Sequence, residues 1–215
     1  MLDTVRRMVN DIYQIMDKRF SSYNISSDKR WFNTIFVSDT FRRAHYEVVN
    51  ELEDHDTYLI HMCIFPCVDD PSPIFGIDIV YNAGKVIGAF HDFSPIGASN
   101  LNDYFNESVR DLKIENKRHL PVWAKNIFSE DIISTGDITN VEEMKNIANV
   151  VIKNLRYYLN NVGEVSEDSS FIEEQNNYCA FQKKNPHVKN TLLKFDYEED
   201  VIDEFINTEL FPEIL

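Results

Sequence analysis

Four strand-like segments follow one another in the first half of the chain, and they constrain the fold more than any other feature. Short polar connections separate them, and they occupy residues 44–49, 58–66, 74–81 and 86–93. In the first segment, Ala44, Tyr46 and Val48 alternate with residues of the opposite face. Consecutive strands joined by short polar turns favour an antiparallel meander. The sequence therefore predicts a central antiparallel sheet.

Helical periodicity flanks this sheet on both sides. Apolar residues recur at helical spacing over residues 2–19 and again over 141–160, where Thr139 or Asn140 is placed to cap the helix. Further elements are expected as helices over residues 101–112, 167–184 and 198–210, and as a short strand over 131–135. A helix, then a sheet, then helices is typical of the α+β class. We expect a three-layer α/β/α sandwich with a central antiparallel sheet.

The length and composition fit one folded unit. The chain has 215 residues, of which 43% are hydrophobic and 13% aromatic, and this is enough for a single substantial core. No Gly/Ser-rich or Pro-rich linker and no internal repeat divides it. We therefore expect a single domain over residues 1–215 and a monomer.

Charge and cysteine content exclude several classes of protein. The net charge of -15 argues against nucleic acid as a partner, because nucleic-acid-binding proteins need a basic surface. We see no signal peptide and no apolar run long enough to span a bilayer, so no membrane association is expected. Cys63, Cys67 and Cys179 form neither a paired framework nor a zinc set. Reduced thiols are expected, and with them a cytoplasmic location.

Three strands carry an ionisable side chain at a position that should be apolar. Glu47, His61 and Asp78 each lie inside an otherwise apolar segment. Each of them alone is more simply explained as a core residue whose hydrogen bonds are made within the protein. Three on adjacent strands indicate a shared use, because buried ionisable groups are costly unless they are paired or neutralised. A buried carboxyl group beside a histidine suits proton delivery to a bound substrate, whereas no metal signature and no nucleophile motif is present.

At these residues the sequence resembles a known family. Six blocks between Phe41 and Phe211 occur in the order found in the ferredoxin-dependent bilin reductases, namely FRRAHYEVVN, LIHMCIFP, IFGIDIV, HDFSP, LPVWAKNIFS and NNYCAFQKKNP. The chain is most similar to the phycocyanobilin:ferredoxin oxidoreductase branch and its phage-encoded relatives. The resemblance implies an α/β/α sandwich that holds biliverdin IXα between the sheet and the C-terminal helices.

The resemblance also implies a reaction. Family members reduce biliverdin IXα by sequential electron and proton transfers through bilin radicals. Reduced 2Fe-2S ferredoxin is the external electron donor, and no metal or flavin cofactor is bound. Phage-encoded relatives perform four-electron reductions, so the expected product is phycoerythrobilin, with phycocyanobilin or a dihydrobiliverdin as alternatives. The expected partners are biliverdin and ferredoxin, together with a heme oxygenase or a bilin acceptor.

Roles for single residues follow from the resemblance by position. Asp78 matches the family's central proton-donating aspartate, and His61 matches the histidine that hydrogen-bonds that aspartate or the bilin lactam oxygen. Glu47 matches the glutamate that serves reduction of the D-ring vinyl group. The interval from Glu47 to His61 is longer than in the phycocyanobilin branch, which indicates a longer turn at residues 51–56. Ser94 matches a position near the bilin propionates.

Two departures from the family pattern bear on the product and on binding. The C-terminal block reads QKKNPHVKN, so Asn185, or Pro186 by another count, occupies the position of a second aspartate. A water molecule or His187 would then replace it. The strand around residues 132–136 lacks the arginine with which relatives hold a propionate. Four basic residues near the bilin's expected edge would bind its carboxylates, dock ferredoxin or simply be solvated: Lys183, Lys184, His187 and Lys189.

Two other interpretations stay open. One is a non-catalytic bilin carrier that lost its second acid at Asn185. The other is an acidic interaction protein with incidental polar residues in its strands. The retained Asp78 and His61 argue against both, since neither role needs a proton donor.

Overall fold

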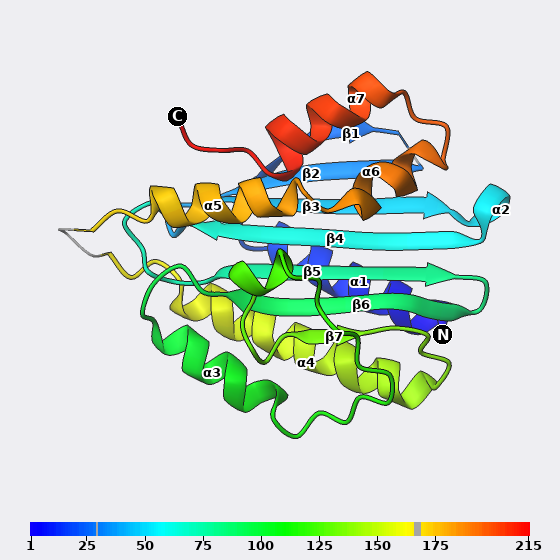
Figure 1. Cartoon of the computed structure of the whole chain (residues 1–215), viewed down its shortest axis with the longest axis horizontal. Coiled ribbons are helices and arrows are strands. Elements are labelled where there is room, and N and C mark those ends of the chain that lie inside the picture. The colour runs from blue at the N-terminus through cyan, green and yellow to red at the C-terminus, as the bar shows by residue number, and fades with distance from the viewer. Residues whose placement is uncertain (29, 166–168) are drawn as a thin grey trace.

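The computed structural model describes residues 1–28, 30–165 and 169–215, and it has three layers (Figure 1). One seven-stranded antiparallel sheet forms the middle layer, in the order β1-β2-β3-β4-β5-β6-β7, so each strand pairs with its neighbour in the chain. The strands are β1 (Ser21–Ser27), β2 (Trp31–Val37), β3 (Phe41–Glu51), β4 (Thr57–Pro66), β5 (Ile74–Asn82), β6 (Lys85–Ser94) and β7 (Ile133–Thr135). This confirms the expected α+β sandwich around an antiparallel sheet.

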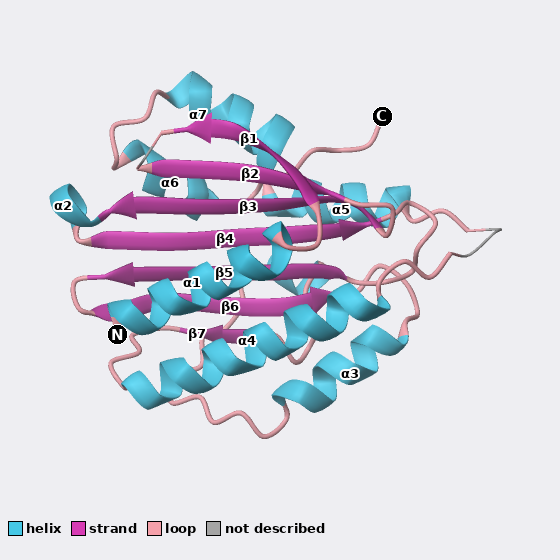
Figure 2. Cartoon of the chain, turned by 180° about the vertical axis from the view of Figure 1, so that it is seen from behind, coloured by secondary structure: helices cyan, strands magenta, loops and turns pink. Residues whose placement is uncertain are grey.

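Helices cover both faces of the sheet. Figure 2 shows one face, which carries α1 (Leu2–Asp17), α3 (Asn100–Val109) and α4 (Val141–Asn161). The other face carries α5 (Ile172–Gln182), α6 (Pro186–Leu193), α7 (Glu199–Phe205) and a π-helical turn over Ile206–Leu210. The one-turn helix α2 (Leu52–His55) joins β3 to β4, and a 3-10 turn spans Ala124–Asn126. Within the described ranges, none of these helices has both the length and the apolarity to cross a bilayer.

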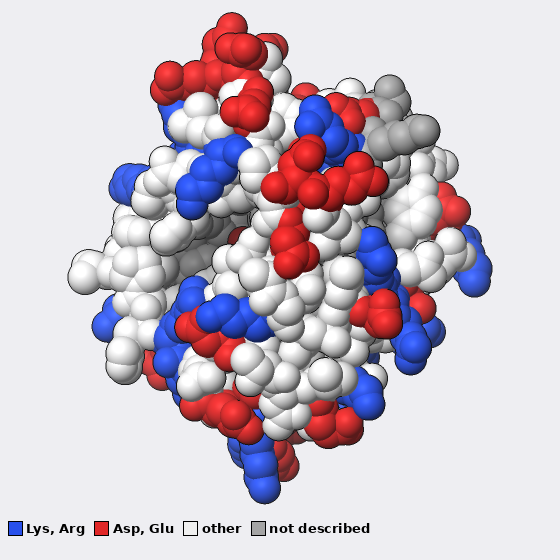
Figure 3. Space-filling model, turned by 90° about the vertical axis from the view of Figure 1, so that its right-hand side faces the viewer, with Lys and Arg blue, Asp and Glu red and all other residues white. Residues whose placement is uncertain are grey.

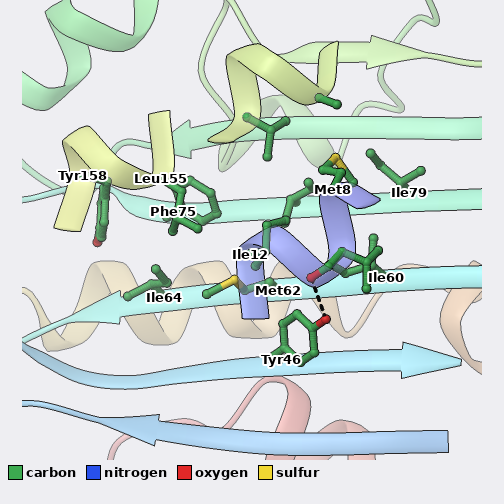
Figure 4. Close-up of a cluster of buried hydrophobic side chains, with 14 of the residues drawn as sticks. Met8, Ile12, Tyr46, Ile60, Met62, Ile64, Phe75, Ile79, Leu155 and Tyr158 are labelled. Carbon is green, nitrogen blue, oxygen red and sulfur yellow. Dashed lines mark hydrogen bonds between the residues drawn. The ribbon is translucent and has the colours of Figure 1, made fainter. Parts of the chain in front are cut away.

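The larger apolar core lies between the sheet and the helices α1 and α4 (Figure 4). Ile12 of α1 and Leu155 of α4 are completely buried there, and full burial of such a side chain contributes about 1.5–3 kcal/mol. The Tyr46 hydroxyl donates to the backbone carbonyl of Val9 at 3.0 Å, which fixes α1 against β3. This face is closed and mainly apolar, apart from the buried pair of His91 and Asn154, whose Nε2 and Nδ2 atoms lie 3.1 Å apart. It supports the sheet and leaves the opposite face for polar chemistry.

The second core, under α5, α6 and α7, is smaller and mixed with polar groups. Trp31 and Phe65 of the sheet pack with Tyr178 of α5, Leu192 of α6 and Phe205 of α7. Trp31 contacts the Phe205 ring with centroids 4.8 Å apart. These contacts fix the C-terminal helices over one part of the sheet.

Several elements differ from the expectation. The strands β1 and β2 and the helix α6 are additional. The strand β1 has the sequence SSYNISS and forms an edge, where no apolar alternation is needed. The helix expected over residues 167–184 begins at Ile172, and residues 166–168 lie outside the described part of the chain. The side chain of Asn140 caps α4 by accepting a hydrogen bond from the backbone N–H of Glu142 at 2.9 Å, as predicted.

Candidate active site

Four polar side chains form a row across the sheet face that carries α5, α6 and α7. This polar row consists of Asn33, Glu47, His61 and Asp78. Antiparallel pairing places Asn33 beside Glu47, Glu47 beside His61, and His61 beside Asp78. Directly paired residues on neighbouring antiparallel strands point to the same face, with Cβ atoms roughly 5 Å apart. The register therefore brings Glu47, His61 and Asp78 side by side, as their positions in adjacent strands suggested.

The C-terminal helices leave part of this face uncovered. Leu59 of β4, Asp78 and Val80 of β5, and Phe90 of β6 are only partly buried, although they belong to central strands. On the side of the sheet that carries the C-terminal helices, the surface is hollowed, and Lys and Arg side chains lie on the rim (Figure 3). We call this uncovered part of the face, with Leu59, Asp78, Val80 and Phe90, the cleft. The apolar neighbours of Asp78 in it suit a flat conjugated ligand.

Asp78 and His61 have polar atoms without partners. The Oδ1 atom of Asp78 and the Nε2 atom of His61 are buried and have no hydrogen-bond partner in the described part of the chain. Burial raises the pKa of Asp78 to about 7 and lowers the pKa of His61 to about 4. Near neutral pH, Asp78 is therefore poised between its two forms and His61 is uncharged. Unpaired buried groups beside a cleft are typical of a site that a ligand completes.

Glu47 is held by a partner of its own. The indole Nε1–H of Trp31 donates to Oε1 of Glu47 at 2.5 Å, and the carboxyl group is almost fully buried. Burial raises the pKa of Glu47 to about 8, with the Trp31 hydrogen bond opposing this rise and the charge of Asp78 adding to it. Glu47 is therefore a neutral acid at neutral pH, with its proton stored two strands away from Asp78.

His45 also belongs to the cluster, although the residue pattern did not identify it. It follows from the alternation in β3 that His45 shares a face with Glu47, and its ring lies 6.0 Å from the ring of His61. Its Nε2 atom lies 3.0 Å from Oδ1 of Asn33. Burial and the neighbouring His61 hold the pKa of His45 well below its usual range. Both imidazoles are therefore neutral, with His61 between the two acids in the register and His45 beside it.

Ser94 and Asn185 lie in local hydrogen-bond arrangements. Ser94 is completely buried, and its hydroxyl donates to Oδ2 of Asp92 at 2.8 Å. Asp92 also accepts from the backbone N–H of Ser129 at 3.0 Å, so it connects β6 to a distant loop. Asn185 caps α6, with its Oδ1 accepting from the backbone N–H of His187 at 3.0 Å. Their substrate contacts stay a prediction.

The basic stretch after α5 is largely neutralised by acids. Lys183 forms an ion pair with Glu213 at 2.7 Å, and Lys189 contacts both Glu199 and Asp203. The exposed Lys184 lies over the ring of Phe181, with Nζ 3.8 Å from the centroid, and His187 is exposed as well. Neither of these two residues forms an ion pair among the residues that the structure describes.

Known proteins resemble this chain over most of its length. A family model described as ferredoxin-dependent bilin reductase matches residues 11–212. The phycocyanobilin:ferredoxin oxidoreductase of Prochlorococcus marinus (strain MIT 9515) is 28% identical over 201 residues, which cover 87% of this chain and 81% of that protein. The phycocyanobilin:ferredoxin oxidoreductase of Trichodesmium erythraeum (strain IMS101) is 27% identical over 188 residues, with coverage of 83% and 75%.

Two solved structures share the fold. The structure of PcyX superposes with a TM-score of 0.70 at 24% identity, and the match covers 98% of this chain and 99% of the other. The phytochromobilin synthase of tomato, in complex with biliverdin, gives a TM-score of 0.68 at 15% identity and coverages of 96% and 81%. The family model spans nearly the whole chain, and the chain therefore belongs to the ferredoxin-dependent bilin reductases, a family of oxidoreductases.

Proposed function

We propose that this protein reduces biliverdin IXα to phycoerythrobilin with four electrons from reduced 2Fe-2S ferredoxin. The polar row carries this proposal, because it combines two acids that hold protons near neutral pH with a neutral histidine at an open cleft. Ferredoxin supplies electrons alone, so each reduction of a bilin double bond by two electrons also needs two protons. A row of buried acids supplies these protons where bulk water has limited access.

Asp78 is the proposed first donor. Its unpaired Oδ1 would receive a hydrogen bond from a pyrrole N–H in the carboxylate form, or the acid would donate to a pyrrole nitrogen. One-electron reduction makes the bilin more basic, so the proton moves from Asp78 to the bilin radical, and the cleft then resupplies Asp78 from water. His61 would orient Asp78 or hydrogen-bond the lactam oxygen through its unpaired Nε2. Glu47 would serve the vinyl group of the D ring.

No acid is proposed at Asn185. An amide can orient a substrate but cannot deliver a proton as a carboxylic acid does, and here its oxygen caps α6. The protons for A-ring reduction would therefore come from Asp78 or through water and His187. Lys184, which follows α5, and His187, in the first turn of α6, are proposed to approach substrate carboxylates, and Ser94 is proposed to lie near the propionates.

The proposal is tested by visible spectroscopy of the protein mixed with biliverdin, followed by addition of a ferredoxin-reducing system. We expect a bound spectrum on mixing and its conversion on reduction. No change on mixing would overturn bilin binding altogether. A bound spectrum that never changes on reduction would favour the bilin carrier. Chromatography against authentic phycoerythrobilin and phycocyanobilin then identifies the product.

The role of Asp78 is tested separately. Asp78→Asn should bind biliverdin and then stall after the first electron, with a long-lived bilin radical visible by electron paramagnetic resonance. The matched control is Asp11→Asn, which removes an exposed carboxylate from α1 on the opposite face of the sheet. Normal turnover in Asp78→Asn would remove the role assigned to it. We further propose that the protein works as a cytoplasmic monomer and exchanges bilin with a heme oxygenase or a bilin acceptor.

A further inference from the structure

A cavity at the β7 end of the polar row contains groups that the proton chemistry does not use. It has a volume of about 520 Å³, and its lining includes Arg118, Lys125, Phe128 and Ser134. The register connects it to the site: Asp78 pairs with Phe90, and Phe90 pairs with Ser134. The three side chains therefore point to the same face, with Ser134 two strands and roughly 10 Å from Asp78.

Backbone hydrogen bonds to β7 determine the position of Arg118. The segment 116–118 runs beside β7 as an added edge, with the N–H of Arg118 donating to the carbonyl of Ser134 at 2.8 Å. The N–H of Gly136 donates to the carbonyl of Asn116 at 3.3 Å, and the Thr135 hydroxyl donates to the same carbonyl at 2.8 Å. The backbone of Arg118 is therefore held against β7 next to a single isolated bridge, although it belongs to a long connection.

Gly136 makes room for the guanidinium group of Arg118. A Cβ atom at residue 136 would lie 2.4 Å from Cζ of Arg118, too close for any side chain while the arginine stays in place. Gly84 and Gly163 are the glycines with positive φ in the described ranges, so the backbone at Gly136 does not itself demand glycine. A Cβ atom at Gly88 would lie 3.8 Å from Nη1 of Arg118. The guanidinium thus reaches over the sheet toward β6.

Both groups retain hydrogen-bonding capacity. Ser134 is 6% exposed, and its hydroxyl oxygen has no hydrogen-bond partner among the described residues. Arg118 approaches Asp137 only to 4.0 Å, while Asp137 is engaged by Lys85 at 2.6 Å. A buried hydroxyl group and a loosely paired guanidinium thus line one cavity, together with the carboxylates of Glu130 and Asp131, and both keep donors available for a ligand.

We propose that Arg118 and Ser134 bind a carboxylate of the substrate, which, if the proposed function holds, is a propionate of the bilin. The guanidinium group offers parallel donors that match a carboxylate, and the hydroxyl group adds a third. A tetrapyrrole centred over Asp78 carries its propionates several ångströms to the side. With its propionate edge turned toward β6 and β7, one of them would lie near Phe90 and Ser134. Ser94 is less suited to this task, because its hydroxyl group is buried and already donates to Asp92.

The test compares biliverdin with its dimethyl ester, which has the same chromophore and no carboxylate. Absorbance titrations without reductant give the preference of each protein for the acid over the ester. The wild type should prefer the acid, and Arg118→Gln should bind the acid about tenfold more weakly and lose the preference. Gly136→Ala should reduce the preference as well, because the added methyl group displaces the flexible arginine. Ser134→Ala should reduce it to a smaller extent.

Lys145→Gln is the control for the charge change, since Lys145 lies on α4 and pairs with Glu142 at 3.2 Å on the other side of the sheet. It should leave the preference unchanged. An undiminished preference in both Arg118→Gln and Gly136→Ala, or equal binding of acid and ester by the wild type, would overturn the carboxylate site and leave bilin binding intact. Failure of the wild type to bind either compound would instead overturn the proposed function.

Discussion

Replacing Asp78 by asparagine should change the pH dependence of stability in the substrate-free protein. Burial raises the pKa of this carboxyl group from 3.8 to about 7. Below about pH 4 the group is protonated in both the folded and the unfolded chain and has no effect on the pH dependence. As the pH rises toward 7, the unfolded chain releases the proton while the folded chain retains it, so the free energy of unfolding falls. Above about pH 7 this fall in the free energy of unfolding is complete. Asparagine does not ionise, so the Asp78→Asn variant does not show this fall.

The size of this effect follows from the pKa. The folded and unfolded values differ by about three, and each pKa unit corresponds to about 1.4 kcal/mol, which gives at most about 4 kcal/mol. Oδ1 is out of contact with solvent, but the residue as a whole is only partly buried. Solvent in the cleft screens the carboxylate and reduces the expected effect to about 2 kcal/mol. The free energy of unfolding of Asp78→Asn, relative to that of the wild type, should therefore rise by about 2 kcal/mol between pH 4 and pH 8.

The assay is urea unfolding of the substrate-free protein across this pH range, with the free energy of unfolding taken from linear extrapolation. Comparing the variant with the wild type cancels the titration of the other carboxylates, Glu47 included, apart from its coupling to Asp78. Asp11→Asn controls for removing one negative charge from a chain of net charge -15. A difference between wild type and Asp78→Asn that stays constant with pH would refute the assignment of Asp78 as a buried, proton-retaining acid.

Two further predictions concern the groups around the site. Trp31→Phe removes the hydrogen bond to Glu47 and leaves a buried acceptor unpaired, so it should destabilise the protein by about 1–3 kcal/mol, measured by urea unfolding. An unchanged midpoint would contradict this. Asn140→Ala removes the cap of α4 and should cost about 1 kcal/mol, whereas Asn140→Ser should restore most of it; equal losses in both variants would exclude capping as the cause.

The sequence predicted the centre of the sheet well because the four strands there are strongly apolar and joined by short connections. Alternation also placed Glu47 on the face of β3 opposite to Tyr46. The direct pairing of Glu47 with His61 could not be predicted from alternation alone, because it depends on the conformation of the turn between β3 and β4. That turn contains the helix α2, and Asp56 after it adopts a left-handed conformation with φ of 47°. A pattern of residue types does not determine such a turn.

Arg118 and Ser134 were beyond sequence reasoning for a different reason. They lie in or beside the irregular connection between α3 and β7, which has neither helical nor strand periodicity over most of its length. The short bridge between residues 117 and 135 pairs segments that no local pattern connects. The edge strand β1 was missed because it is polar and is stabilised by backbone hydrogen bonds with β2. Backbone hydrogen bonds do not require particular residue types, so the sequence shows no strand pattern there.

The polar row runs across the strands, and each of its members comes from a different strand of a meander. The row of site residues therefore runs perpendicular to the strands. The hairpin turns lie at the ends of the strands, away from these residues. Relatives can lengthen or shorten those turns and change the number of residues between the acids while the acids remain neighbours. An insertion of one residue within a strand would instead turn the following members toward the apolar core. Alignments of this family should accordingly place their gaps in the turns, and the spacing of the site residues along the sequence should vary more than their positions in space.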